Sequence, residues 1–276
     1  MRIDTHQHYW RIDRGDYGWI TPEHSVLYRD FMPSDLEPLL NQHNFNGSII
    51  VQAAPTIDET NYILALADQT SSVLGVVGWL DLFDPDHRKY YDQFRRSSKF
   101  KGFRIMIQDM PDASRILDPQ FIDRLRGYAA EDVPVDLLLV SEQMETVLQL
   151  LQKVPNLRSV INHIAKPSIK SREFESWARY LSDFAQFPGI YCKLSGMVTE
   201  ADHKQWRLEE FTLYIRKVLE EFGPDRVMFG SDWPVCLLAA EYGQVMEILL
   251  HALPETWGES ERDRLFGMNA KVFYKL

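Results

Sequence analysis

The chain opens with Ile3-Asp4-Thr5-His6-Gln7-His8-Tyr9-Trp10, a short run of strand character that contains two histidines. Side chains two residues apart in a strand point to the same face, so His6 and His8 are expected to project side by side. Asp4 shares their phase, and a buried carboxylate there needs a partner. An open doubly wound sheet usually follows its first strand with a glycine-rich phosphate turn. No such turn follows here, which argues against that fold.

Eight short runs of strand character alternate with longer stretches of helical character. Several are almost continuously apolar, as expected for a parallel sheet buried on both faces. The expected strands are Arg2–Gln7, Gly47–Ala53, Gly75–Leu80, Gly102–Ile107, Pro134–Val140, Arg158–His163, Ile190–Ser195 and Val227–Ser231. The pattern predicts an α/β fold, a (β/α)8 TIM barrel, with an open doubly wound sheet as the alternative.

Composition narrows the class of protein. The chain has 276 residues, and such barrels commonly form one domain of about 250 residues. No linker-like segment interrupts it, so residues 1–276 are expected to form a single domain. The net charge of -10 and the lack of a basic run argue against nucleic acid as a partner. No apolar run reaches the ~20 residues of a membrane helix. Cys192 and Cys236 are too few for a disulfide framework and are interpreted as buried packing residues, so a cytoplasmic location is expected.

Active sites of barrels lie at the carboxyl ends of the strands. Polar or aromatic residues at or near the predicted ends are His6, His8, Gln52, Trp79, Asp81, Arg104, Asp136, His163, Lys193, Ser195 and Asp232. Taken alone, His163 would be interpreted as a structural histidine and Asp232 as a turn cap. Only eight histidines occur in the chain, so three at one predicted mouth indicate a common role.

Hydrolysis is the chemistry that this set predicts. His6, His8 and His163 can hold a divalent metal or donate hydrogen bonds to a carbonyl oxygen, and either stabilises the oxyanion formed by water attack. Asp232 can accept the proton of that water. Arg104 is interpreted either as a substrate-binding guanidinium or as the partner of Asp136 in a structural ion pair.

The ordered set resembles the amidohydrolase superfamily. It is most similar to the sugar-lactone hydrolase branch, related to L-fuconolactonase and 2-pyrone-4,6-dicarboxylate lactonase. The resemblance spans the chain. Its motifs are His6-Gln7-His8, Asn162-His163-Ile164-Ala165-Lys166-Pro167, Cys192-Lys193-Leu194-Ser195-Gly196, Met228-Phe229-Gly230-Ser231-Asp232-Trp233-Pro234, and the ending with Asn269-Ala270 and Phe273-Tyr274.

Two departures bear on the metal. Binuclear members of the superfamily carry a lysine on strand four, and many carry a further histidine on strand five, where this chain has Arg104 and Asp136. The resemblance therefore implies either no required metal or a single zinc ion. A single ion would be held by the four predicted catalytic residues, namely His6, His8, His163 and Asp232.

The resemblance implies a hydrolase of carbohydrate metabolism that opens an aldonolactone, similar to L-fuconolactone, to its hydroxy acid. Its small-molecule substrate would be bound by Arg104, Lys166, Trp79, Trp10 and Gln52. The 9–32 loop would act as a lid or seal the barrel edge. Alternatives are a metal-dependent amide or ester hydrolase, a decarboxylase, and a non-catalytic barrel that binds a sugar acid. A homo-oligomer is compatible with the sequence.

Overall fold

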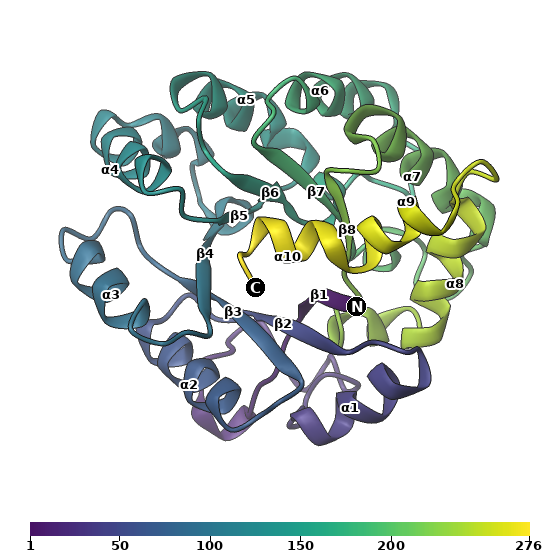
Figure 1. Cartoon of the computed structure of the whole chain (residues 1–276), viewed down its shortest axis with the longest axis horizontal. Coiled ribbons are helices and arrows are strands. Elements are labelled where there is room, and N and C mark those ends of the chain that lie inside the picture. Colours follow the sequence, from purple (N-terminus) through teal and green to yellow (C-terminus); the bar gives the residue numbers. More distant parts are fainter.

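The computed structural model describes all 276 residues, and it confirms the predicted (β/α)8 barrel (Figure 1). Eight parallel strands follow one another around the barrel in sequence order. They are β1 (Ile3–Gln7), β2 (Gly47–Val51), β3 (Val73–Trp79), β4 (Phe100–Met106), β5 (Val135–Leu138), β6 (Ser159–Ile161), β7 (Ile190–Leu194) and β8 (Val227–Phe229). Each predicted strand is present, and all but the first end one or two residues earlier than the sequence pattern suggested.

The barrel closes between its first and last strands through the segment that follows β8. The Asp232 amide donates to the His6 carbonyl oxygen over 2.7 Å, and the His8 amide donates to the Trp233 carbonyl oxygen over 2.8 Å. These bonds place the end of β1 directly beside Asp232. Barrel closure therefore brings residues that are 224 positions apart in the chain into one site.

Helices form the outer ring (Figure 1). The main ones are α1 (Pro33–Gln42), α2 (Ile57–Asp68), α3 (His87–Phe94), α4 (Pro119–Ala130), α5 (Met144–Lys153), α6 (Glu175–Ala185), α7 (Leu208–Phe222) and α8 (Tyr242–Ala252). Short 3-10 turns cover Ile12–Arg14, Ile107–Asp109, Ala113–Leu117, Ser141–Gln143, Asn162–Ala165, Val198–Glu200 and Val235–Leu238. Each main helix buries an apolar stripe against the strands, as its 3.6-residue periodicity dictates.

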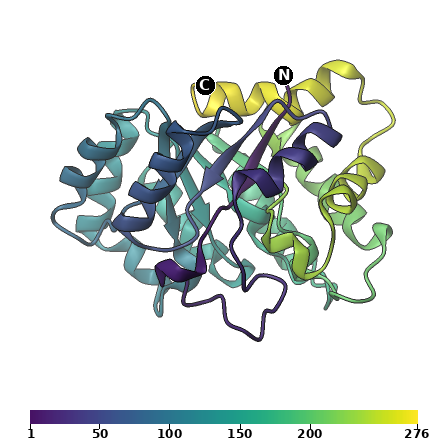
Figure 2. The ribbon, with the colours of Figure 1, turned by 90° about the horizontal axis from the view of Figure 1, so that it is seen from below.

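The amino end of the barrel is covered by the C-terminal segment. Helix α9 (Glu259–Asp263), a π turn (Arg264–Met268) and α10 (Asn269–Phe273) run across this end of the strands (Figures 1 and 2). Side chains of α10 and of Tyr274 complete an apolar cluster inside the barrel. The cluster is Ile3, Ile49, Val51, Val77, Val160, Met228, Ala270, Phe273 and Tyr274. The end opposite the active-site mouth is therefore a packed plug.

The 9–32 loop lies at the other end of the barrel, where it projects away from the C-terminal segment (Figure 2). Trp10 and Phe31 pair their backbones, and their rings pack edge to face at 5.3 Å between centroids. This part of the loop seals the barrel edge, whereas Asp16 and Trp19 line a cavity at the mouth. Cys192 and Cys236 are free and buried, as expected. None of the helices has the length and apolar character needed to cross a membrane.

Candidate active site

The four predicted catalytic residues converge at the carboxyl end of the barrel. One carboxylate oxygen, Asp232 Oδ1, lies 3.3 Å from His8 Nε2, 3.7 Å from His6 Nε2 and 3.8 Å from His163 Nε2. Each of the four side chains is at least 95% buried. Three imidazole nitrogens thus face a single carboxylate oxygen in a protein-enclosed setting, where hydrogen bonds and charges act strongly.

Left-handed backbone turns the two late residues inward. His163 and Asp232 lie two and three residues beyond the ends of β6 and β8, with φ of 53° and 58°. Positive φ continues through Ile164, Ala165 and Lys166. Such conformations are rare for residues other than glycine, above all for β-branched isoleucine, and they cluster at functional sites. The sequence pattern placed His163 on the sixth strand and Asp232 directly after the eighth, because periodicity does not reveal a turn of this kind.

A glycine makes room for the His163 imidazole. A Cβ atom at Gly196 would lie 2.3 Å from His163 Nδ1, and the glycine itself has a φ of 62°. A side chain is therefore excluded at this position on two counts. The freed space lets His163 Nδ1 reach the Ser195 hydroxyl oxygen at 2.9 Å.

The second ring nitrogen of each histidine has a different partner. His8 Nδ1 lies 2.7 Å from the Val51 carbonyl oxygen, which can only accept, so this nitrogen carries the proton. His6 Nδ1 lies 3.4 Å from the Lys193 ammonium. Asp4, which the sequence suggested as a partner for a histidine ring, instead accepts from the Ser231 amide and the Tyr242 hydroxyl. The three imidazoles are therefore not equivalent.

Burial sets the protonation states of the site. It lowers the pKa of His6 well below its usual range, lowers the pKa of His8, and lowers that of His163 to about 3. Burial acts to raise the pKa of the Asp232 carboxyl, but His163 and His8 outweigh it and hold that pKa below its ordinary value. At neutral pH the site therefore contains neutral imidazoles around an ionised carboxylate.

A cavity of about 490 Å³ opens at this end of the barrel and is lined by His8, His163 and Asp232, whereas His6 is fully buried and does not line it. Two cationic side chains line it. The Arg104 guanidinium is buried, donates to the Gln52 carbonyl oxygen and has no carboxylate in contact, so it does not form the ion pair with Asp136 considered above. Lys166 is half-buried and lies 3.9 Å from a Glu200 carboxylate oxygen. A buried, unpaired guanidinium in a cavity is an anchor for a carboxylate or a polarised carbonyl.

Three residues predicted to bind substrate lie outside this cavity. Trp10 is 0% exposed and packs against Trp19 at 5.6 Å between ring centroids. Trp79 lines a neighbouring cavity of about 270 Å³, which shares Pro55, Met106 and Asp109 with the main one. Gln52 is fully buried, and neither polar atom of its side chain has a hydrogen-bond partner.

Other cavity residues were not singled out by sequence reasoning. Trp19 is 41% exposed, and its indole N–H donates to the Ala53 carbonyl oxygen. Polar atoms also come from Asp16, Gln108, Asp109 and Thr199. Trp19 could be recognised only as one of several aromatic residues in a long loop, and nothing in the local sequence distinguished it from Trp10.

The distances in the site suit a divalent cation. Ligand atoms about 2.1 Å from a tetrahedral zinc ion lie about 3.4 Å apart, close to the separations around Asp232 Oδ1. His6, His8 and Asp232 offer ligand atoms within 4.8 Å of one another. His8 also has the usual orientation of a metal ligand, because its other nitrogen donates to a backbone carbonyl. The site can therefore accommodate a divalent metal.

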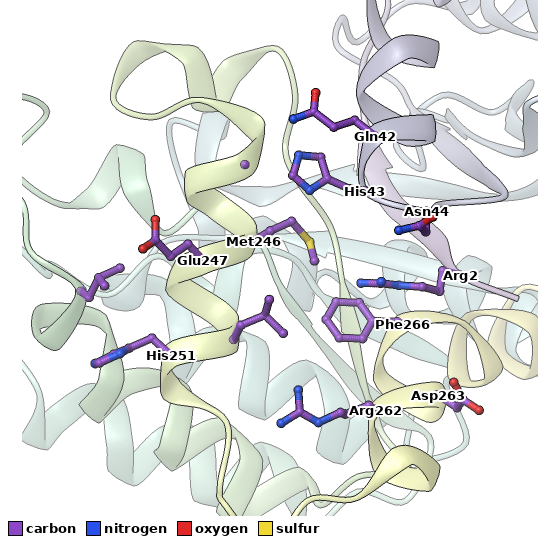
Figure 3. A pocket seen from close by; sticks show the side chains of 13 residues that line it. Arg2, Gln42, His43, Asn44, Met246, Glu247, His251, Arg262, Asp263 and Phe266 are labelled. Atoms are coloured by element: carbon purple, nitrogen blue, oxygen red, sulfur yellow. The ribbon is translucent and has the colours of Figure 1, made fainter.

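A larger groove of about 710 Å³ lies away from this site (Figure 3). It is formed by the end of α1, by α8 and by the segment around Phe266, and includes none of the predicted site residues. Its arginines, Arg2 and Arg262, are accompanied by the carboxylates of Glu247 and Asp263 (Figure 3). Charges of both signs without converging catalytic groups do not make an active site, so size alone does not locate the chemistry.

Comparison with known proteins agrees with the motifs and the barrel. The model of the amidohydrolase family matches residues 3–276. The chain belongs to this family. The resemblance inferred from the sequence is thereby confirmed for the family as a whole.

Individual relatives are also similar, two of them over almost their full length. An L-fucono-1,5-lactonase from Burkholderia ambifaria is 38% identical, with 100% of this chain and 96% of the relative covered. A crystal structure of an amidohydrolase from Burkholderia multivorans with bound zinc has a TM-score of 0.94 and 36% identity, with 100% and 99% of the chains covered. An L-rhamnono-gamma-lactonase from Scheffersomyces stipitis is 30% identical over 66% of this chain and 62% of the relative.

Proposed function

We propose that this protein hydrolyses a sugar-derived lactone, of the L-fuconolactone kind, to the corresponding hydroxy acid. The observation that carries the proposal is the arrangement of three histidine Nε2 atoms around Asp232 Oδ1, beneath a cavity that contains an unpaired arginine. Full-length similarity to an L-fucono-1,5-lactonase supports the choice of substrate class. The names of the lactonase relatives indicate neutral sugar lactones rather than peptides or amides.

Asp232 and His8 form the proton-accepting side of the proposed site. Asp232 is ionised, and neutral His8 has its lone pair on Nε2, 3.3 Å from the carboxylate oxygen. A proton on either atom can be shared with the other at this distance. Water that attacks the lactone carbonyl would give its proton to Asp232, where His8 stabilises it until the ring oxygen leaves and takes it up. This role for His8 replaces the carbonyl-polarising role expected from the sequence.

His6 and His163 form the donor side. When the Ser195 hydroxyl donates to His163 Nδ1, the ring proton lies on Nε2 and points into the site. Hydrogen bonds from such positions stabilise the oxyanion of the tetrahedral intermediate. If a divalent ion were held by His6, His8, His163 and Asp232, their facing nitrogens would carry lone pairs instead of protons, and the ion would polarise the carbonyl in place of these hydrogen bonds.

Arg104, Lys166 and Trp19 would bind the substrate. Hydrolysis converts a neutral lactone into a carboxylate, so negative charge grows during the reaction and Arg104 interacts with the product more strongly than with the substrate. The indole of Trp19 offers an apolar face for a sugar ring, and Lys166 can donate to hydroxyl groups. This assignment makes Arg104 a stabiliser of developing charge as well as an anchor.

The test is acid release from a panel of lactones that includes L-fucono-1,5-lactone, L-rhamnono-gamma-lactone, other aldonolactones and a pyrone dicarboxylate. Wild type is compared with Asp232→Asn and with Asp123→Asn, which replaces an exposed carboxylate on α4. We expect turnover of at least one sugar lactone, a loss of about 10²–10⁴-fold in kcat for Asp232→Asn, and no loss for Asp123→Asn.

Chelator-treated protein, with and without added zinc, extends the same assay. Activity that persists without metal supports direct polarisation by the histidines, whereas activity that requires zinc assigns the polarisation to a bound ion. Absence of turnover for every lactone, with or without zinc, would refute the proposed function and leave only the family and the site.

A further inference from the structure

Lys193 lies inside the barrel beneath the active site and has no role in the reaction described so far. It belongs to β7, is 0% exposed, and brings its ammonium group to 3.4 Å from Nδ1 of His6. Its carboxylate partner is Asp136 on β5, at 2.6 Å. A lysine buried this completely must have its charge and all its donors accounted for.

The carboxylate of Asp136 is itself saturated by donors. Asn162 Nδ2 and Lys193 Nζ donate to its Oδ2 over 2.8 and 2.6 Å, and the Tyr274 hydroxyl donates to its Oδ1 over 2.7 Å. Burial lowers the pKa of the Lys193 ammonium, and the charge and hydrogen bond of Asp136 oppose that shift. The contact with Asp136 thus favours the ammonium form that donates to it.

The ammonium group of Lys193 has three N–H donors, so three acceptors are needed to satisfy it. Two are unambiguous, namely Asp136 Oδ2 and the Thr5 carbonyl oxygen at 2.9 Å. The third neighbour is His6 Nδ1 at 3.4 Å. An ammonium cannot accept a hydrogen bond. A proton on His6 Nδ1 would therefore place one donor against another and leave the third N–H of Lys193 without a partner.

We propose that Lys193 is a positioning residue that holds His6 in the tautomer with its proton on Nε2, so that His6 is a hydrogen-bond donor to the reacting carbonyl. His6 Nε2 is buried and has no acceptor within hydrogen-bonding distance in the protein, since Asp232 Oδ1 lies 3.7 Å away, so its proton is not engaged by a protein group. In this tautomer Nε2 has no lone pair for a metal. His8, with its proton on Nδ1, is held in the opposite state by the Val51 carbonyl.

The inference gives the two histidines of the first strand different functions. His8 accepts protons or binds a cation, and His6 donates. The pair would thus combine a basic and an acidic face within one His-Gln-His motif. The donor role of His6 rests on the proposed function, whereas its tautomer does not and can be observed without substrate.

Nitrogen-15 NMR of protein labelled at histidine tests the tautomer, because protonated and unprotonated ring nitrogens differ strongly in chemical shift. The His6 signals are assigned by their loss in His6→Gln. The test variant is Lys193→Met with Asp136→Asn, which removes both charges together and leaves the net charge of the chain unchanged. The matched control is Tyr274→Phe, which removes one hydrogen bond from Asp136 but keeps the ammonium beside His6.

In wild type and Tyr274→Phe we expect a protonated Nε2 and an unprotonated Nδ1 at His6. In the double variant we expect the His6 signals to shift toward the other tautomer, the His8 signals to stay, and kcat for the lactone to fall about 10²-fold at similar KM. A protonated Nδ1 at His6 in wild type, or unchanged His6 signals in the folded double variant, would overturn the inference. If wild type turned over no lactone, the proposed function would be refuted, but the spectra would still decide the tautomer of His6.

Discussion

At the carboxyl end of the barrel, buried polar side chains lie at a cavity or close to it, and several of their atoms lack protein partners, including His6 Nε2, Arg104 Nε and both amide atoms of Gln52. At the amino end, Ala270 and Phe273 of α10 and the following Tyr274 close the barrel with buried, mostly apolar side chains. The mouth also holds left-handed backbone at His163 and Asp232. Unsatisfied groups and strained turns cost stability, so the mouth is built for ligands and the plug for stability.

Removing the charge of Arg104 should give the largest difference in activity between a variant at the mouth and a matched variant at the amino end. Arg104→Met is expected to lower kcat/KM for the lactone by about 10²–10³-fold, because a buried donor aimed at developing charge is lost. The matched control is Arg226→Met. Arg226 precedes β8 at the amino end and also donates to backbone carbonyls, of Ala185 and Phe187. Steady-state kinetics and thermal melts of both variants provide the measurement, and equal losses of activity would remove the distinction between the ends.

Crowding the His163 ring should give the next largest effect. Gly196→Ala places a Cβ 2.3 Å from His163 Nδ1 in the wild-type geometry, so the ring must move. Displacement of a catalytic group by about 1 Å can cost about 10²-fold in rate, which is the loss we expect in kcat.

Gly223→Ala is the control for Gly196→Ala. Gly223 has nearly the same φ, 63°, but a Cβ there would contact nothing within 4 Å. Both variants should lower the melting temperature through backbone strain, and only Gly196→Ala should lower kcat. An active Gly196→Ala enzyme would show that the position of His163 is not critical.

The pH profile of activity should reflect the protonation states that burial imposes on the histidines and Asp232 at the mouth. Burial lowers the pKa of His163 to about 3, and His163 and His8 hold the pKa of Asp232 below 3.8. The working states, neutral imidazoles and an ionised carboxylate, therefore persist as pH falls through 6.5. We expect kcat/KM to decline only in acid, below the ordinary pKa of an aspartate carboxyl, where Asp232 takes up a proton. A fall in kcat/KM with a midpoint near pH 6.5, measured where the protein stays folded, would contradict this assignment.

Stability should respond to pH in a different window. Between the unfolded pKa of 6.5 and the folded value of about 3, His163 binds a proton in the unfolded state but not in the folded state. The free energy of unfolding should therefore fall as pH decreases through this window. Denaturant titrations at several pH values measure the slope, and His163→Gln should make it shallower.

Truncation in the plug should have the smallest effect on activity. Phe273 is 0% exposed and belongs to the apolar cluster at the amino end. Phe273→Ala should lower the free energy of unfolding by about 3–5 kcal/mol. Activity of the folded fraction should change less than about twofold, since no site residue loses a contact. A large loss of kcat at full folding would show that the plug also tunes the site, for example through Tyr274 and Asp136.

The sequence by itself determined the barrel, the number of strands and the strand ends at which the chemistry would lie. It could do so because strand periodicity and burial are local properties, and because the spacing of His6 and His8 fixes their shared face. The set of four catalytic candidates followed from the rule that barrel sites lie at the carboxyl ends.

Only the tertiary structure decided which side chains meet and how each one is oriented. Trp19 rather than Trp10 lines the cavity because the path of the 9–32 loop is set by long-range packing. The left-handed turns at His163 and Asp232 need the surrounding barrel to hold them. Lys193 contacts His6 inside the closed barrel, although the two residues are 187 positions apart in the chain. Contacts of this kind depend on closure of the whole sheet, which no local pattern in the chain encodes.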